Sequence, residues 1–175
     1  MVFPLLALLA ACTVTAGRGG YAERELAHRE EQVRRGLAGA RDPGAERDLH
    51  ALACRLLPER CDHLRVYVVA SDAVQARAWP NGMLLVHGGL FPHLDDEAEL
   101  AFALGHELAH LALGHFQATR DPTLETEADA WASARLAALG YREDAGSTLL
   151  TRLAGTPHLD ARVARERIEA LGGAR

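Results

Sequence analysis

Two histidines and a glutamate in the segment His-Glu-Leu-Ala-His are the residues of this sequence best suited to metal chemistry. His106 and His110 are four positions apart, so on a helix both imidazoles project from one face and reach one metal ion. Glu107 lies between them, where its carboxylate takes a proton from water that zinc has made more acidic, without itself being a ligand. The pattern predicts a zinc-dependent hydrolytic site with Glu107 as the general base.

A third ligand is expected from the acidic segment Glu-Thr-Glu-Ala-Asp that begins at Glu125. Glu125 and Asp129 share a helix face, whereas Glu127 points roughly 160° away from Glu125. We therefore expect Glu125 to complete a His, His, Glu site for one zinc ion per chain, with Asp129 hydrogen-bonded to the far nitrogen of a histidine ligand. The position of His115 does not fit a third histidine ligand of the metzincin pattern.

The histidines lie in a segment that is otherwise apolar. A helix is expected from an N-cap at Asp95 to a stop at Gly114, apolar nearly all round and therefore buried. Burying a polar His-Glu-His group costs several kcal/mol unless its members are satisfied, and a metal ion satisfies them. The alternatives are core histidines bonded to carbonyl groups and, for the Glu125 segment, a solvated acidic first turn that complements the helix dipole.

Other elements follow from periodicity and turn residues. Aromatic residues make up only 5% of the chain and the formal net charge is -5, which favours a helical domain and excludes nucleic acid as the main partner. Nothing after residue 12 is apolar for long enough to cross a membrane. The fold class expected is α+β, mostly helical, with a small sheet beside the metal-binding helix. Helices are predicted at 21–38, 45–57, 95–113, 121–139, 148–153 and 160–171, and strands at 64–70 and 83–87.

The N-terminus is typical of an export signal. Residues 2–11 are apolar but too short for a membrane span, and the run Leu-Ala-Ala-Cys ending at Cys12 resembles the bacterial lipoprotein box. Cleavage there would remove residues 1–11 and leave a lipidated Cys12, anchored in the periplasm at the outer membrane. The alternative is an ordinary secretory signal. Export would place Cys54 and Cys61 in an oxidising compartment and favours a disulfide between them over two free thiols or a zinc site.

The segments HELAHLALGHF and ETEADAWASARLAALGY resemble the paired HExxH and ExxxD motifs of peptidase family M48, which includes CAAX prenyl proteases and HtpX-type membrane proteases. The resemblance extends over residues 45–175, including a strand, turn and edge-strand region at residues 66–90. It implies a gluzincin-like domain in which His106, His110 and Glu125 bind zinc, Glu107 is the catalytic base and Asp129 supports a ligand. Without multi-pass helices, the chain resembles the minimal soluble members.

The residue that stabilises the transition state is left open. The family commonly has His-Pro followed by an arginine near the C-terminus, whereas this chain has Thr-Pro-His and then Arg162; His158, Arg162 and Tyr141 are the candidates for this or a gating role. Three segments are expected, namely a signal peptide at 1–11, a tether with a helix at 12–44, and a metallopeptidase domain at 45–175. The predicted activity is endopeptidase quality control of misfolded envelope proteins. The alternatives are a noncatalytic zinc lipoprotein that acts as a chaperone and a scaffold with a fortuitous motif.

Overall fold

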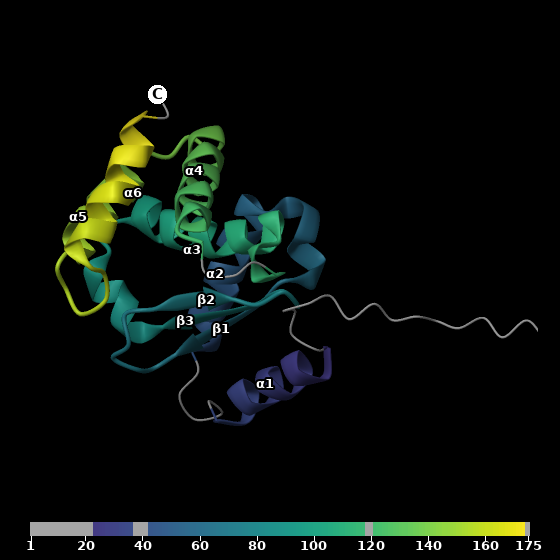
Figure 1. Cartoon of the computed structure of the whole chain (residues 1–175). Helices are drawn as coiled ribbons and strands as arrows, with labels where there is room; N and C mark the ends of the chain where they lie inside the picture. Colours follow the sequence, from purple (N-terminus) through teal and green to yellow (C-terminus); the bar gives the residue numbers. More distant parts are fainter. Residues whose placement is uncertain (1–22, 37–41, 118–120, 174–175) are drawn as a thin grey trace, which may run out of the picture.

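The computed structural model describes residues 23–36, 42–117 and 121–173. The predicted signal peptide and the lipidation site at Cys12 lie outside these residues. Within the described ranges, we find no helix with the length and apolar character that crossing a membrane requires. The fold is α+β and mostly helical, with one small sheet (Figure 1), which confirms the fold class expected from the sequence.

A three-stranded sheet forms the centre of the fold. Its strands are β1 (Arg65–Val69), β2 (Ala76–Ala78) and β3 (Met83–His87). They lie in the order β1-β3-β2, with β3 parallel to β1 and antiparallel to β2. The sequence predicted β1 and β3, but β2 was missed as a separate strand because three residues are too few to show an alternating pattern.

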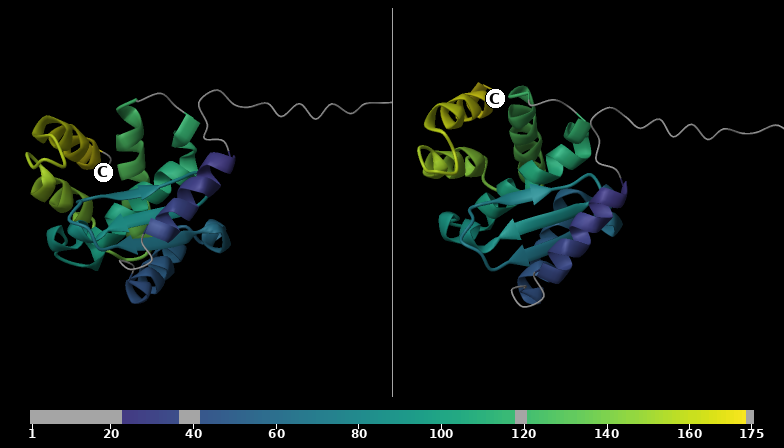
Figure 2. Two further views of the ribbon diagram at one scale, coloured as in Figure 1. Left: turned by 90° about the horizontal axis from the view of Figure 1, so that it is seen from below. Right: turned by 60° about the horizontal axis from the view of Figure 1, so that its bottom comes forward.

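The two faces of the sheet are covered by different helices. Side chains such as Val68 and Val86 face the main core with α2 (Pro43–Leu56) and α3 (Glu97–Leu113). Tyr67 and Met83 instead form a smaller cluster with α1 (Glu23–Gly36). Figure 2 shows α1 lying across the face of the sheet opposite the other helices. Both faces of this sheet are therefore buried, which agrees with the nearly continuous apolar character of β1 and β3.

Helix boundaries follow the capping residues. Asp42 caps α2, and its Oδ1 accepts hydrogen bonds from the backbone amides of residues 44 and 45. Asp96, rather than the predicted Asp95, caps α3, since the Asp96 side chain accepts the Glu99 amide while Asp95 pairs with Arg152. α3 ends where Gly114 adopts the left-handed conformation, with φ of 73°.

Of the remaining helices, two pack on α3 and the last packs on those two. They are α4 (Thr123–Ala138), α5 (Ala145–Leu153) and α6 (Ala161–Gly173), with short 3-10 turns at η1 (Pro58–His63), η2 (Gly88–His93) and η3 (His115–Gln117). Gly105 allows α3 and α4 to approach closely, because a Cβ atom there would lie 3.1 Å from that of Ala132. This contact brings the start of α4 beside the predicted ligands on α3.

A buried carboxylate fixes the other end of α3. Glu99 is fully buried and accepts hydrogen bonds from Arg142 and Thr148, both at 2.9 Å, and from Arg152. These bonds hold its pKa below the ordinary value although burial acts in the opposite direction. The network ties α3 to α5, whose leucines form a wall of the cavity described below.

Candidate metal centre

Three side chains from two helices converge on one point. Nε2 of His106 lies 3.2 Å from Nε2 of His110 and 3.3 Å from a carboxylate oxygen of Glu125, whose other oxygen lies 3.7 Å from His110. Four ligands placed tetrahedrally about zinc at its usual bond lengths are about 3.3 Å apart. The spacing of the donor atoms therefore suits one zinc ion, and these are the three residues predicted as its ligands.

Charge gives a second test of whether the site suits a divalent ion. Glu107, Glu125 and Asp129 bring three carboxylates together, and Arg167 is the cation that pairs with two of them. With both histidines neutral, as metal ligands are, three carboxylates and one guanidinium leave two negative charges, which a divalent cation neutralises. Both the donor spacing and the charge fit zinc.

Protonation of the two histidines shows where the site favours positive charge. Burial opposes a charge on His106, but its hydrogen bonds to Asp129 and Glu125 outweigh burial and raise its pKa to about 9. Burial and the neighbouring His106 lower the pKa of His110 to about 4. The hydrogen bond with His106 lowers the pKa of Glu125 to about 2. Positive charge is thus favoured at the His106 ring, which lies between the carboxylates of Glu125 and Asp129.

Asp129 and Arg167 orient His106. Nδ1 of His106 lies 2.8 Å from Oδ1 of the fully buried Asp129, which leaves Nε2 directed at the ligand cluster. Arg167 on α6 donates to both oxygens of Asp129, at 2.6 and 2.7 Å. These bonds hold the pKa of Asp129 below its usual value against the effect of burial. The sequence analysis expected such a hydrogen bond between Asp129 and a histidine of this cluster.

His115 occupies a similar position beside His110. The Nδ1 atoms of the two rings are 2.9 Å apart, and Nε2 of His115 lies 3.4 Å from the Glu127 carboxylate. His110 consequently also presents Nε2 to the cluster. The sequence analysis disfavoured His115 as a third histidine ligand and did not identify this contact, because His115 lies on η3, beyond the end of α3.

Glu107 faces the edge of the sheet. Its Oε2 accepts a hydrogen bond of 2.9 Å from the backbone amide of Ala78 on β2. The other carboxylate oxygen of Glu107 does not take part in this hydrogen bond. Burial of the side chain raises the pKa of Glu107. A carboxylate with a raised pKa beside a ligand cluster has the properties of a general base.

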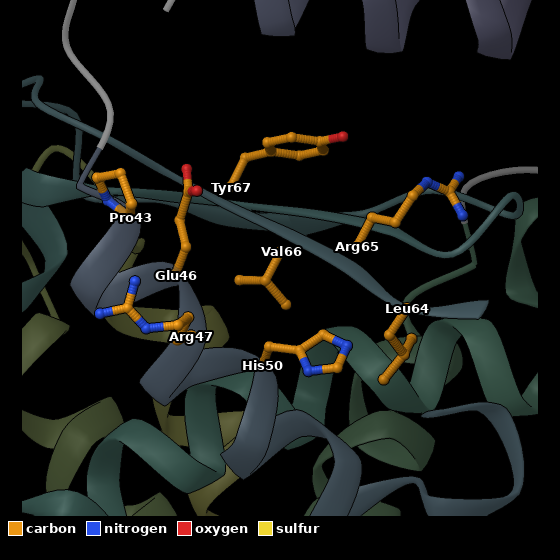
Figure 3. A pocket seen from close by; sticks show the side chains of 8 residues that line it. All are labelled: Pro43, Glu46, Arg47, His50, Leu64, Arg65, Val66 and Tyr67. Atoms are coloured by element: carbon orange, nitrogen blue, oxygen red, sulfur yellow. The ribbon is translucent and has the colours of Figure 1, made fainter. Parts of the chain in front are cut away.

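A cavity of about 240 Å³ opens beside Glu107. Its walls come from β2 and the residues before it, η2, α3, α5 and the segment after α5, with one residue each from α4 and α6, and most of the lining side chains are apolar. His158, one of the residues considered for the transition-state or gating role, is among the lining residues. The side chains that line it are Val74, Gln75, Ala76, Leu90, Phe102, Ala103, His106, Glu107, Glu125, Leu149, Leu150, Leu153, His158, Leu159 and Arg167. A second cavity, of about 470 Å³, lies between α2 and β1 and contains none of the predicted catalytic or metal-binding residues (Figure 3).

Two predicted candidates lie away from the cluster. Arg162 is 70% exposed and pairs with Glu166 on the same helix, and the Tyr141 hydroxyl donates to Glu97 at the opposite end of α3 from His110. The arginine at the site is Arg167, whose side chain is only 12% exposed. Three arginines lie on α6, and spacing alone did not reveal which one faces α4.

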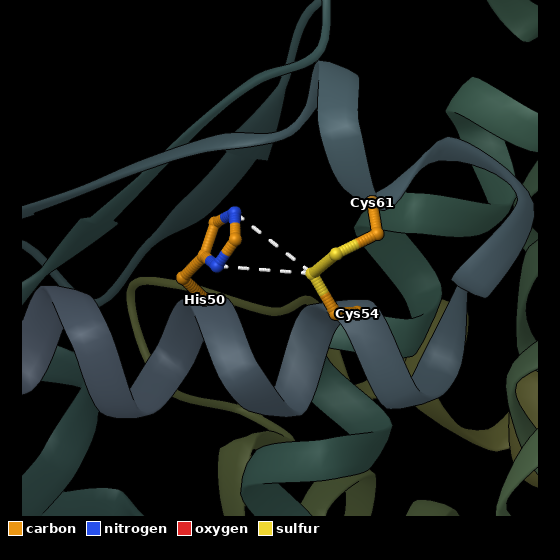
Figure 4. The surroundings of a disulfide bond; sticks show 3 residues. All are labelled: His50, Cys54 and Cys61. Atoms are coloured by element: carbon orange, nitrogen blue, oxygen red, sulfur yellow. Dashed lines mark hydrogen bonds between the residues drawn. A yellow bond between two sulfur atoms is a disulfide. The ribbon is translucent and has the colours of Figure 1, made fainter.

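Cys54 and Cys61 are joined by a disulfide bond in the structure. His50 lies on the same side of α2 as Cys54, one turn earlier (Figure 4). The Nδ1 atom of His50 is 3.7 Å from the Cys54 sulfur.

Residues 41–121 match peptidase family M48. Human mitochondrial metalloendopeptidase OMA1 is 42% identical over 50 residues, which cover 29% of this chain and 10% of the human protein. The Beta-barrel assembly-enhancing protease of Yersinia pestis is 33% identical over 85 residues, 49% of this chain and 15% of that protein. The chain thus matches only a small part of each relative's length.

The matched region contains His106, Glu107 and His110 and ends before Glu125. The assignment of Glu125 therefore depends on the geometry of the cluster. The family match, the two relatives and the histidine pair on α3 show that the matched part of this chain is similar to M48 metallopeptidases.

Proposed function

We propose that the chain is a zinc-dependent endopeptidase in which His106, His110 and Glu125 hold one zinc ion and Glu107 is the general base. The observation that carries the proposal is the position of Glu107. Its carboxylate lies beside three convergent donor atoms and lines a cavity bordered by an edge strand. A purely structural zinc site needs no such base and is usually closed by four protein ligands.

The bound zinc would polarise the scissile carbonyl and increase the acidity of water. Glu107 accepts the proton from the attacking water on the oxygen that does not bind Ala78, and then passes it to the leaving amine. Asp129 keeps the ring of His106 in position, and Arg167 keeps Asp129 charged in its buried position. His158, which lines the same cavity, is the candidate for stabilising the oxyanion.

The edge of β2 supports a polypeptide substrate. On the side that faces β3, the carbonyl of Gln75 accepts a hydrogen bond from the His87 amide. The Trp79 amide donates one to the carbonyl of Met83. Along an antiparallel strand, residues whose backbone groups bond to the neighbour alternate with residues whose backbone groups point the other way. The backbone groups of Ala76 and Ala78 therefore point away from β3, and the Ala78 amide donates to Glu107. An extended peptide can pair with the backbone of Ala76 and enter the apolar cavity beside the base.

We place the substrates among misfolded proteins of the bacterial envelope, with the chain anchored through a lipid on Cys12 at the outer membrane. The similarity to the Beta-barrel assembly-enhancing protease and the lipoprotein-like Leu-Ala-Ala-Cys run support this location. Cys12→Ser should release the protein from the membrane fraction or leave an uncleaved precursor. Equal fractionation and equal maturation of both forms would contradict the lipid anchor.

The activity is tested with Glu107→Gln, which keeps the size of the side chain but removes its basicity. Casein hydrolysis should fall by about 10³-fold or more, because proton transfer is lost in addition to the electrostatic role of the carboxylate. Zinc content and the circular dichroism spectrum should remain unchanged. The matched control is Glu97→Gln, at an exposed position on the same helix, which should retain the wild-type rate.

The noncatalytic alternative makes the opposite forecast. A zinc-containing chaperone would prevent aggregation equally well with glutamine at position 107 and would show no casein cleavage above background in the wild-type protein. Wild-type hydrolysis by Glu107→Gln would end the proposed mechanism. If this variant lost both zinc and activity, Glu107 would be a structural residue of α3 and the base would lie elsewhere.

A further inference from the structure

A second cluster of metal-binding residue types lies on α2 and η1. His50 and Cys54 are four residues apart on α2, and Cys61 comes from η1 (Figure 4). The ligand atoms of the three residues lie within 4.8 Å of one another. The sulfur of Cys54 is 3.7 Å from His50 Nδ1, close to the separation of about 3.6 Å expected between a sulfur and a nitrogen that bind one zinc ion tetrahedrally.

We propose that reduction of the Cys54–Cys61 disulfide creates a second metal site, formed by two thiolates and the His50 imidazole, for zinc or a similarly thiophilic ion. In the oxidised chain the sulfurs are bonded to each other and are poor ligands. In the reduced chain they are thiols, which lose their protons to become thiolates when they bind a metal ion. This site is independent of the proposed peptidase activity.

The reaction that opens the site is thiol-disulfide exchange with a dithiol reductant. One thiolate of the reductant attacks the sulfur of one cysteine, breaks the Cys54–Cys61 bond and releases the other cysteine. The second thiolate of the reductant then attacks the reductant's own sulfur in the mixed disulfide and releases the first cysteine. The reductant leaves as a cyclic disulfide, and Cys54 and Cys61 gain the two electrons and two protons it has lost. Zinc replaces the two thiol protons, which pass to the buffer.

The protein frame around the cysteines does not depend on the disulfide alone. Leu56 and Leu57 are almost completely buried and follow Cys54, while the buried Leu64 follows Cys61. These side chains anchor the end of α2 and the end of η1 in the main core. The Cα atoms of the two cysteines are 4.7 Å apart, so the reduced sulfurs stay within reach of one ion if the anchors hold.

Solvent has access to this cluster. His50, Cys54 and Cys61 are each partly exposed. His50 also lines the cavity of about 470 Å³ between α2 and β1, as Figure 3 shows. An ion and a reductant can therefore approach without unfolding the core, and water can fill the fourth coordination position.

The test compares metal content before and after reduction. We would use the full chain with Cys12→Ser, which leaves Cys54 and Cys61 as the only thiols, since the sequence has three cysteines. After treatment with dithiothreitol and its removal under nitrogen, zinc is added and unbound metal is removed. The reduced chain should hold one zinc ion more than the oxidised chain. Cobalt should give a thiolate charge-transfer band only after reduction.

Two histidine variants identify the third ligand. His50→Ala should weaken binding of the additional ion at least tenfold, whereas His63→Ala, at an exposed position on η1, should leave it unchanged. Circular dichroism of the reduced chain should keep its helical signal. The proposal is overturned if no additional ion binds, if His50→Ala binds it as tightly as the parent, or if the reduced chain loses its helices.

Discussion

His106 with His110 on α3 and His50 with Cys54 on α2 are two pairs of ligand residues with the same helical spacing. Each pair is completed by a residue from another element. This residue is Glu125 on α4 for the α3 pair and Cys61 on η1 for the α2 pair. Their surroundings differ. Asp129 and Arg167 support the α3 pair through buried hydrogen bonds, whereas no carboxylate in the described part of the chain is hydrogen-bonded to His50.

This difference shows what helical spacing contributes to a metal site and what it does not. A separation of four residues places two donors on one face wherever a helix forms. Orientation and charge come from neighbouring elements, and only α3 lies against helices that supply them. We therefore expect the α3 cluster to bind zinc in the oxidised chain and the α2 cluster to do so only after reduction.

The largest effect expected from this comparison is the loss of zinc in His110→Ala. Removing one of three protein ligands should reduce the zinc content of the oxidised chain from about one ion to none and abolish casein hydrolysis. Metal analysis by mass spectrometry and a casein assay measure both. His50→Ala is the matched variant on α2, and in the oxidised chain it should retain zinc and the wild-type rate. Zinc retained by His110→Ala would refute the site assignment.

A smaller effect is expected when the support of His106 is removed. Asp129→Asn keeps the shape of the side chain but weakens its bonds to His106 and Arg167, and should lower zinc affinity by about 10- to 100-fold. Competition with a chromophoric chelator gives the affinity. Asp48→Asn, on the exposed face of α2, should cause no change. Equal affinities for the parent and Asp129→Asn would mean that the hydrogen bond does not orient the ligand.

The smallest effect on activity is expected from the disulfide. Changing both Cys54 and Cys61 to serine should reduce the free energy of unfolding by roughly 2–3 kcal/mol, the entropic estimate for a loop of this length. Urea denaturation measures this loss. The rate per folded molecule should remain within about twofold of the wild type, because neither cysteine lines the cavity beside Glu107. A large fall in rate with the fold intact would show that the two regions are coupled.

Local patterns in the sequence were sufficient for the main helices and for the composition of the cluster on α3. The four-residue separations within the His106 and Glu125 motifs correctly indicated which side chains share a face, because the period of a helix is fixed by its backbone hydrogen bonds. Capping residues located the helix ends to within a few positions. The strand β2 was missed because its three residues are held by pairing with β3 rather than by their own pattern.

The sequence by itself determined the pairs His106 with His110 and Glu125 with Asp129, since each pair lies within one helix. Tertiary structure alone decided that Arg167 rather than Arg162 reaches Asp129, that Tyr141 lies away from the cluster, and that Ala78 binds Glu107. These contacts join residues that are 29 or more positions apart. Their formation depends on how the helices and the sheet pack, and that packing is set by the shape of the whole core rather than by any local period.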